Sequence, residues 1–329
     1  MTAGASDESF RAIFEPHRRS ITLHCYRMLG SLQDAEEIVQ ETLLRAWQRK
    51  EEAQSATLRP WLYKIATNAC LDQLLKTRRR RALPQLVFPP SSPAVRLASP
   101  TDERLWIEPM PNALLDVPAD ASAQPDQRVP LRESVGLAFI SALQLLSPKQ
   151  RAALLLVDVL EWQPREVATL LDTSLVSINS LLQRARKSVI CARAEAPPAA
   201  LSQADAALLQ RFINTWESGD TAAFSALLAD DALFSMPPQR EWFAGREAIG
   251  QFFAAMWRAQ PGQRRLVKIA ANGGPAVAVY RRLLTANARF EAGGITLLTL
   301  REGLISQITR FGSPQLFPLF GLPTQLPDD

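Results

Sequence analysis

The side chains best suited to chemistry lie along one face of a helix predicted between Ser174 and Lys187. Ser174 is a favourable N-cap for this helix. One face of this helix is apolar, with the spacing of a buried helical stripe, and consists of Ile178, Leu181, Leu182, Ala185 and Val189. The other face presents hydroxyl, amide and guanidinium groups, which suit base edges and phosphates in a DNA major groove. The residues predicted to contact DNA are Arg165, Ser174, Val176, Ser177, Asn179, Ser180, Gln183, Arg184 and Lys187.

A second helix is predicted just before this one, so that the two form a helix-turn-helix. Pro164 suits the first turn of a helix, where its missing N–H is not needed. Val167, Leu170 and Leu171 form an apolar stripe, and the polar residues from Asp172 onward interrupt it. Helix-turn-helix spacing is a moderately specific signal, and the alternative is an ordinary solvated helix in an all-α domain.

A basic segment between Leu58 and Arg81 is the second candidate for contact with nucleic acid. This segment contains seven basic residues and one acidic residue, which gives it the positive charge that phosphate contact requires. Trp61, beside cations and an amide, suits the stacking of unpaired bases. The alternatives are a core position for Trp61 and a solvated helix end for the arginine run. The candidate DNA-contacting residues are Trp61, Lys64, Asn68, Asp72, Lys76, Arg78, Arg79 and Arg80.

A polar helical face precedes the basic segment. The predicted buried side of this helix consists of Ala35, Ile38, Val39, Thr42 and Ala46. Its polar side carries Asp34, Glu37, Gln40 and Glu41. A solvated surface is the default interpretation of such a face, and a partner-binding surface is the alternative.

Length, charge and cysteine content limit the remaining possibilities. The chain has 329 residues, which suggests two to three domains, and its net charge is only +4. Three widely spaced cysteines and two histidines predict neither a disulfide framework nor a metal site. The N-terminus lacks the apolar core of a signal peptide, and no apolar run reaches the roughly 18 residues of a membrane span. We therefore expect a cytoplasmic protein without a metal or cofactor.

Four segments follow one another along the chain. Residues 8–81 and 131–194 are helical in pattern, and residues 201–322 predict helices packed on an antiparallel sheet, an α+β layer pair. Residues 82–130 form a linker with ten prolines and an excess of acidic residues, so we expect a semi-extended spacer without a core of its own. An apolar island within it, Trp106–Pro111, is expected to act as an anchor.

The two helical segments resemble parts of the sigma-70 family of RNA polymerase sigma factors. Asp34–Thr42 and Arg59–Asp72 are similar to region 2, and Leu146–Arg151 with the helix-turn-helix is similar to region 4. Regions 1.1 and 3 are missing, as in the extracytoplasmic-function group. The last segment resembles a SnoaL-like domain of the NTF2-like fold, which a subset of these factors carries. That second resemblance rests on Trp216–Asp220, Leu228–Ala232 and Gly245–Ile249.

The resemblance implies a role for each surface. The face with Asp34 and Glu37 would dock on the clamp helices of the polymerase. The loop Glu51–Arg59 and the helix Trp61–Arg81 would capture and melt the −10 element. The helix-turn-helix would read the −35 element, and the acidic linker would lie where RNA later exits. The implied partners are core RNA polymerase, promoter DNA and, for the C-terminal domain, the sigma regions of the same chain. That domain would be a regulatory module.

Two other functions compete with this one. An isomerase or cyclase of the NTF2-like fold needs an acidic base, but Met236 stands at the expected position and the domain has no histidine. A one-component repressor would combine a helix-turn-helix with a ligand pocket, but it has no need of a polymerase-docking helix. The apolar residues of the domain form either a pocket or a plain core; the candidates are Trp216, Phe234, Met236, Trp242, Phe253 and Trp257.

Overall fold

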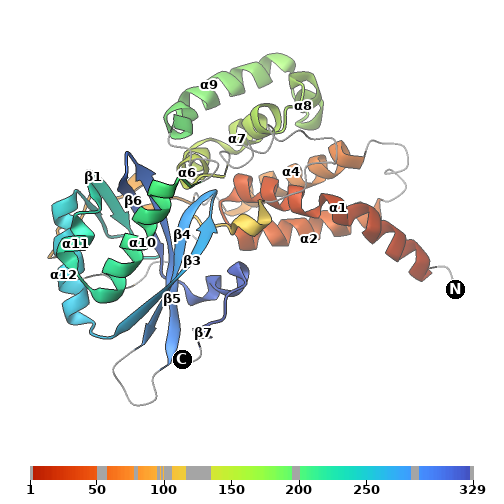
Figure 1. Ribbon diagram of the computed structural model, residues 1–329. Coiled ribbons are helices and arrows are strands. Elements are labelled where there is room, and N and C mark those ends of the chain that lie inside the picture. Colours follow the sequence, from red (N-terminus) through yellow and green to blue (C-terminus); the bar gives the residue numbers. More distant parts are fainter. Residues whose placement is uncertain are drawn as a thin grey trace. The chain divides into compact units, whose positions relative to one another are not determined.

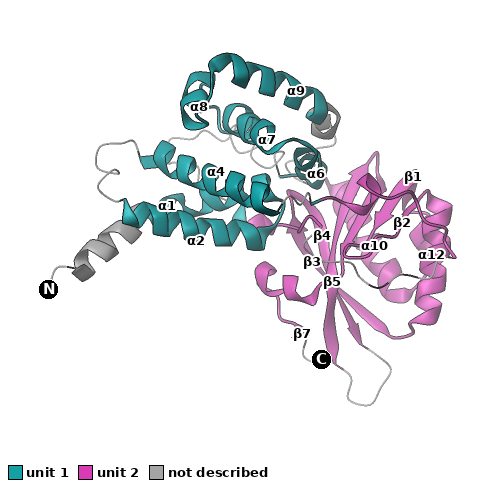
Figure 2. Ribbon diagram, turned by 180° about the vertical axis from the view of Figure 1, so that it is seen from behind, with its two compact units in different colours: residues 1–81, 114–196 teal, residues 82–113, 197–329 magenta. Residues whose placement is uncertain are grey.

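The computed structural model describes residues 3–49, 58–77, 81–94, 97, 99, 106–115, 135–194, 201–282 and 289–326. The chain divides into two compact units (Figure 2). Unit 1 comprises Met1–Arg81 and Leu114–Ala196, and unit 2 comprises Ala82–Ala113 and Pro197–Asp329. Unit 1 is helical, whereas unit 2 contains a sheet. Within the described ranges, no helix is both long enough and apolar enough to cross a lipid bilayer.

Three long helices build the first half of unit 1 (Figure 1): α1 (Ala3–Leu29), α2 (Leu32–Gln48) and α4 (Leu58–Thr77). α1 ends at Leu29, and Gly30 follows it with a φ of 72°, which favours a residue without a Cβ. The Ser31 hydroxyl then caps α2 by accepting the Asp34 N–H at 3.1 Å. The predicted buried side of α2 is confirmed; its buried residues are Leu32, Ala35, Ile38, Val39, Thr42 and Ala46.

Shorter helices build the second half of unit 1. They are α6 (Leu137–Leu145), α7 (Pro148–Leu154), the single π-helical turn η5 (Leu155–Val159), α8 (Pro164–Leu170) and α9 (Leu175–Ala194). Ser147 and Gln150 form a capping box at the start of α7, where the Ser147 N–H donates to Gln150 Oε1 at 2.9 Å. α9 packs against α6, α7 and α8, and α7 also contacts α1 and α4.

A buried arginine joins the two halves of unit 1. Arg151 on α7 is 2% exposed, and its Nη1 donates to Gln144 Oε1 at 2.6 Å and to the Met28 carbonyl. Its Nη2 donates to the carbonyls of Gln144 and Leu146 at 3.2 and 3.3 Å. Gln144 in turn donates to the Arg27 carbonyl at 3.3 Å. Because Arg27 and Met28 belong to the last turn of α1, this guanidinium ties α7 to α1.

Among its described residues, unit 2 contains three α-helices and one sheet (Figure 1). The helices are α10 (Gln203–Ser218), α11 (Thr221–Ser225) and α12 (Arg246–Ala259). The strands are β1 (Leu228–Ser235), β2 (Trp242–Ala244), β3 (Gln263–Ala271), β4 (Gly274–Arg282), β5 (Phe290–Arg301), β6 (Leu304–Phe311) and β7 (Gln325–Leu326). Short 3-10 turns complete the described chain: η1 (Pro84–Leu86), η3 (Asn112–Leu114), η6 (Pro314–Leu316) and η7 (Pro318–Phe320).

The strand order is β2-β1-β6-β5-β4-β3, with β7 paired to β5. Neighbouring strands are antiparallel, as predicted, except that β1 and β6 are parallel. The direction of β6 is set by its hairpin with β5, so the pair with β1 differs from the expected pattern. The short strand β2 was not predicted, because three residues are too few to show a strand period.

α10 and α12 pack on one face of the sheet, called the inner face below. Phe234, Val279, Leu298 and Ile308 project from that face into a large apolar cluster. Phe212 of α10 and aromatic residues of α12 fill the same cluster. Because side chains alternate along a strand, this cluster identifies which residues of β3 to β6 lie on the inner face.

Two described stretches of the predicted linker pack on unit 2. In the first, the Phe88 carbonyl accepts the Trp242 indole N–H at 2.8 Å. In the second, the Met110 N–H donates to Asn272 Oδ1 at 2.9 Å. Trp106 is 5% exposed and Met110 is fully buried, so the apolar island is an anchor, as predicted. The spacer expected over residues 82–130 is therefore not extended in residues 82–94 and 106–113, because its apolar side chains find a surface on unit 2.

Candidate nucleic-acid interface

The helix-turn-helix forms with the predicted buried and exposed sides. The Ser177 N–H donates to Ser174 Oγ at 3.1 Å, which confirms Ser174 as the N-cap of α9. The buried side of α9 consists of Ile178, Leu182, Ala185 and Val189, whereas Leu181, which was predicted on the same side, is half-buried. Arg165 on α8 is exposed, and on α9 Val176 is 78% exposed. The other exposed candidates are Ser174, Asn179, Ser180, Gln183, Arg184 and Lys187, whereas Ser177 is half-buried.

Two neighbouring arginines of α9 have different surroundings. Arg186 is held by a bidentate ion pair, with Nη2 2.7 Å from Asp158 Oδ1 and Nε 3.0 Å from Oδ2. The hydrogen bonds that Arg186 donates to the Asp158 carboxylate raise the pKa of Arg186. Arg184 makes only weak contacts, from Nε to the Ser180 carbonyl at 3.2 Å and from Nη2 to Ser180 Oγ at 3.4 Å. Arg186 therefore holds α9 against η5, while Arg184 can reach a ligand.

α4 presents part of the predicted basic segment. Its buried residues include Leu62, Ile65, Ala66 and Ala69, as predicted. Trp61 is half-buried, so part of its indole remains accessible. Among the other candidates, Asn68 is half-buried, and Lys64, Asp72 and Lys76 are exposed. Arg78, Arg79 and Arg80 lie outside the described residues.

The four polar candidates on α2 do not form one free surface. Asp34 accepts a hydrogen bond from Arg81 Nη2 at 2.9 Å, and the Arg81 side chain is 8% exposed. Glu41 is paired with Arg45 at 2.6 Å on the same helix. Glu37 and Gln40 are exposed. Asp34 is therefore engaged in holding the chain after α4, whereas Glu37 and Gln40 face outward.

Two apolar residues of α2 were missed by the sequence reasoning. Leu44 is 55% exposed and Trp47 is 42% exposed. On a helix, these positions lie on the outward side with Glu37 and Gln40. The sequence contains this information, because Leu44 and Trp47 are apolar but lie outside the predicted buried stripe. Such an exposed apolar pair favours a partner-binding surface over a solvated one.

The candidate pocket residues of unit 2 are packed against one another. Five of the six belong to the apolar cluster, with Phe253 at the centre. Its ring centroid is 5.0 Å from that of Trp216, 4.8 Å from that of Phe234 and 5.3 Å from that of Trp257. Trp242 lies on the opposite face of the sheet, since its register partner is Ser235 rather than Phe234. These contacts favour a core over a pocket.

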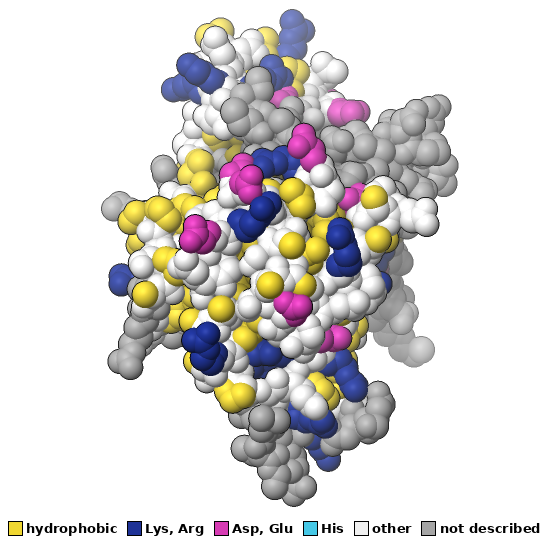
Figure 3. Space-filling model, turned by 60° about the vertical axis from the view of Figure 1, so that its left-hand side comes forward, with side chains coloured by type: hydrophobic (Ala, Val, Ile, Leu, Met, Phe, Trp, Pro, Cys, Tyr) yellow, Lys and Arg dark blue, Asp and Glu magenta, His cyan; other side chains and the backbone are white. Residues whose placement is uncertain are grey.

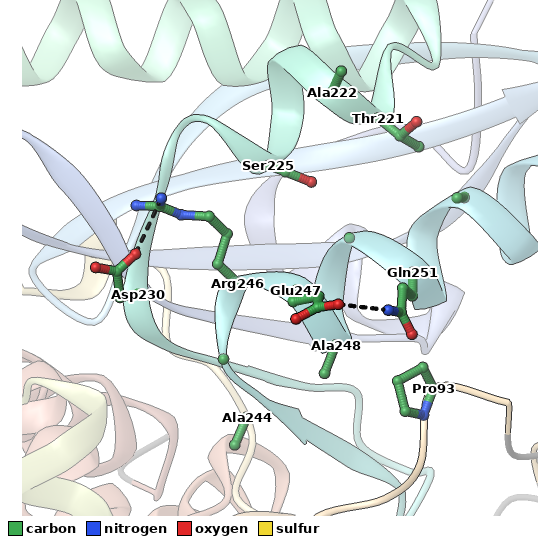
Figure 4. Close-up of a pocket in the computed structure, with 13 residues that line it drawn as sticks. Pro93, Thr221, Ala222, Ser225, Asp230, Ala244, Arg246, Glu247, Ala248 and Gln251 are labelled. Atoms are coloured by element: carbon green, nitrogen blue, oxygen red, sulfur yellow. Dashed lines mark hydrogen bonds and ion pairs between the residues drawn. The ribbon is translucent and has the colours of Figure 1, made fainter.

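An open groove of about 970 Å³ lies where α11 meets the start of α12 (Figure 4). The carboxylate of Asp230 lies 3.0 Å from Arg246 Nη1, and Gln251 Nε2 donates to Glu247 Oε1 at 3.1 Å. Pro93 of the linker also lines the groove. These polar groups are paired with one another, and most of the other lining side chains are small. We therefore assign no ligand to this groove.

The side of the molecule in Figure 3 shows no field of a single sign. Acidic and basic side chains are interspersed there among apolar ones. Contact with DNA requires a concentration of positive charge. The described residues that were predicted to contact DNA lie on α4, α8 and α9 of unit 1.

Comparison with known proteins places these helices in families. Residues 13–80 match the family model of sigma-70 region 2, and residues 136–189 match that of sigma-70 region 4. Residues 209–308 match the model of the SnoaL-like domain.

Similar proteins align with nearly the whole chain. The chain is 44% identical over 324 residues to the ECF RNA polymerase sigma factor SigG of Mycobacterium tuberculosis, covering 96% of this chain and 85% of that one. It is 27% identical over 317 residues to SigJ of the same organism, covering 92% of each chain. The crystal structure of the M. tuberculosis extracytoplasmic function sigma factor SigJ has a TM-score of 0.62 at 23% identity, and the match covers 95% of this chain and 99% of that one. The chain thus has the fold of that structure.

Proposed function

The chain belongs to the extracytoplasmic-function group of RNA polymerase sigma factors, and we propose that it contacts the polymerase through α2 and promoter DNA through α4 and α9. The observation that carries this proposal is the polar face of α9, exposed over a fully buried apolar stripe. A helix held in this way can enter a major groove without giving up its packing.

The −35 element is read by the exposed face of α9. Asn179, Ser180 and Gln183 carry short polar groups suited to base edges, and Arg165, Arg184 and Lys187 suit phosphates. Binding of DNA competes with the weak Arg184–Ser180 contacts, which releases both side chains to the groove. The Arg186–Asp158 pair keeps the helix in place meanwhile.

The −10 element is bound by α4. The accessible part of the Trp61 indole offers a surface on which an unpaired base can stack, with Lys64 and Asn68 on the following turns. A base extracted from the duplex needs such stacking together with contacts to its edge. Lys76, Arg78, Arg79 and Arg80 supply charge for the phosphates. Arg81, which follows them, is buried and paired with Asp34.

The polymerase is bound by the outward side of α2. Glu37 and Gln40 provide the polar part of this surface, and Leu44 and Trp47 provide its apolar part. Exposed apolar residues at the centre of a polar surface are typical of protein interfaces. Asp34 contributes through its ion pair with Arg81 rather than by direct contact.

Unit 2 regulates these activities and is not an enzyme. Support comes from the aromatic cluster, in which five of the six candidate pocket residues pack against one another and form a core. The linker between the two sigma regions packs partly on unit 2, so unit 2 sets how much of that linker is free to span them. Catalysis of transcription itself belongs to the polymerase.

Charge reversal on α2 tests the docking surface. Glu37→Lys should weaken binding to core RNA polymerase in a pull-down, whereas Glu36→Lys should bind as the native chain does, because it makes the same charge change at the edge of the surface. Leu44→Ala should also weaken binding, without any change of charge. Equal binding by Glu37→Lys and Glu36→Lys would disprove the assignment.

Base readout by α9 is tested on a panel of −35 variants. Replacing Asn179, Ser180 and Gln183 together by Ala should flatten the sequence preference, since a good base contact provides about 1–3 kcal/mol of discrimination. Gln210→Ala with Asn214→Ala removes two exposed amides from α10 and serves as the control. An unchanged preference in the triple variant would overturn the assignment. Run-off transcription with core polymerase then measures the effect on initiation.

Removal of unit 2 tests its regulatory role. A chain truncated after Pro198 would expose Trp106 and Met110. The truncated chain should therefore also carry Trp106→Ser and Met110→Ser, which limit aggregation. Its promoter activity should differ from that of the full chain over a range of concentrations, at equal binding of polymerase. Equal activity would remove the regulatory role.

A further inference from the structure

Three arginines gather on the inner face of the unit 2 sheet, Arg264 on β3, Arg281 on β4 and Arg310 on β6. Arg264 and Arg281 are directly opposite in the strand register, so their side chains share a face. That face is the inner one, because Leu266 and Val279, two residues along each strand, belong to the apolar cluster. All three arginines keep part of their surface accessible.

Arg281 and Arg310 meet beside Gly293 of β5. Arg310 Nη2 donates to the Gly293 carbonyl at 2.7 Å. A Cβ added to Gly293 would lie 3.5 Å from both Cγ and Cδ of Arg281. Because Arg264 is on the other side of Arg281, the side chain of Arg281 lies between the other two arginines.

The surroundings of the arginines do not balance their charge. Burial lowers the pKa of Arg310 to about 10 and lowers that of Arg264, and in each case repulsion from Arg281 adds to the shift. In the described part of the chain, none of the three forms an ion pair. Keeping all three arginines charged therefore costs free energy in the folded protein.

Nearby acidic residues do not neutralise the cluster. Oε1 of Glu217 on α10 accepts a hydrogen bond from the Leu266 N–H at 2.8 Å. Glu291 is opposite Arg281 in the strand register, but it is exposed and the described structure has no ion pair between them. Arg264 is partly compensated, since it donates to the Gln260 carbonyl at 3.0 Å.

Unused hydrogen-bonding groups surround the cluster. A guanidinium has five N–H donors. Among the described residues, the guanidinium groups of Arg264 and Arg310 each donate a single hydrogen bond, and that of Arg281 donates none. Thr296 is fully buried and lies opposite Arg310, and its Oγ1 has no partner in the described chain. The same holds for the buried indole N–H of Trp257, whose ring centroid is 5.5 Å from Arg264 Cζ.

We propose that unit 2 binds a small molecule through a carboxylate or phosphate group held by Arg264, Arg281 and Arg310. Guanidinium groups match such oxyanions with paired, charge-assisted hydrogen bonds. An anion between the arginines removes their mutual repulsion and uses donors that the protein leaves unpaired. The proposal concerns binding and does not depend on the role of the chain in transcription.

Calorimetric titration of the full chain tests the proposal, with inorganic phosphate and acetate as probes and chloride at matched ionic strength as the reference. Phosphate, acetate or both should bind the native chain. Arg281→Gln should lower the affinity about tenfold or more, because it removes at least one charge-assisted contact. Arg282→Gln is the matched control. It removes the same charge from the next residue of β4, which lies on the outer face with Cζ 4.7 Å from the Phe290 ring centroid.

A second measurement separates binding from folding. In chloride, Arg281→Gln should melt at the same temperature as the native chain or higher, because it removes repulsion without breaking a hydrogen bond. The proposal is overturned if neither probe binds the native chain at about 10 mM, a concentration at which even weak specific sites fill. It is also overturned if Arg281→Gln and Arg282→Gln weaken binding equally, which would indicate general charge attraction. The stronger of the two probes identifies the group that the site prefers.

Discussion

Replacing Arg151 by Met is expected to destabilise unit 1 by about 2–4 kcal/mol. The guanidinium makes two strong hydrogen bonds, to Gln144 Oε1 at 2.6 Å and to the Met28 carbonyl. Hydrogen bonds to a charged group contribute about 1.5–3 kcal/mol each, so this pair contributes about 3–6 kcal/mol. Two further bonds, at 3.2 and 3.3 Å, add little. Met offsets part of the loss, because it fills a similar space and needs no desolvation of a charge.

Urea unfolding of the full chain measures this change. With a slope of about 2 kcal/mol per M, the midpoint of unit 1 should fall by about 1–2 M. Hydrogen exchange locates the effect, and protection should drop in the last turn of α1 and in α6 and α7 but not in β4 and β5. Arg165→Met is the control, since Arg165 is an exposed arginine of the same unit and its loss should change stability by less than about 0.5 kcal/mol. Equal midpoints for the two variants, or a uniform loss of protection, would refute the role of Arg151 as the joint within unit 1.

Three further substitutions test other parts of the structure. Burial and the charge of Arg27 lower the pKa of His24 from 6.5 to about 3. Below pH 6.5 the unfolded chain therefore binds a proton that the folded chain excludes, and unit 1 should lose about 1.4 kcal/mol per pH unit until near pH 3. His24→Gln should reduce this slope in urea titrations between pH 7 and pH 4.5, and an unchanged slope would contradict the assignment. Met110→Ala should destabilise unit 2 by about 2–5 kcal/mol by opening a cavity, whereas an effect near zero in thermal unfolding would mean that the linker is not anchored. Gly294→Ala should be more destabilising than Gly303→Ala. The added Cβ would lie 2.5 Å from the Phe311 carbonyl oxygen in the first case and meet nothing within 4 Å in the second, so equal melting temperatures would exclude that contact.

Much of the fold and part of the candidate site could be predicted from local patterns. The stripe of Ile178, Leu182 and Val189 predicted the buried side of α9 and therefore its exposed polar side as well. Such patterns are informative because a helix can bury only one face, and the residue period shows which. Ser174 was equally predictable, since an N-cap depends only on the residues next to it. The sigma-70 motifs, which are local too, identified the family.

Contacts between distant residues were decided by the tertiary structure alone. Asp34 was expected to face a partner, but its carboxylate pairs with Arg81, a residue 47 positions away. Helical periodicity cannot show such a pairing, because it depends on how α2 and the end of α4 meet. Helical periodicity also cannot show that Arg151 is buried, because its burial depends on contact with the last turn of α1.

The composition of the linker predicted a spacer, yet Trp106 and Met110 are buried because unit 2 provides a surface for them. In the sheet, the strand register brings Arg264 opposite Arg281, and the return of β6 beside β5 brings Arg310 to the same place. Each arginine alone reads as an ordinary exposed strand residue. The sequence determines which side chains a helix or strand exposes, whereas strand order and helix packing decide which of them meet, because those contacts join segments far apart in the chain.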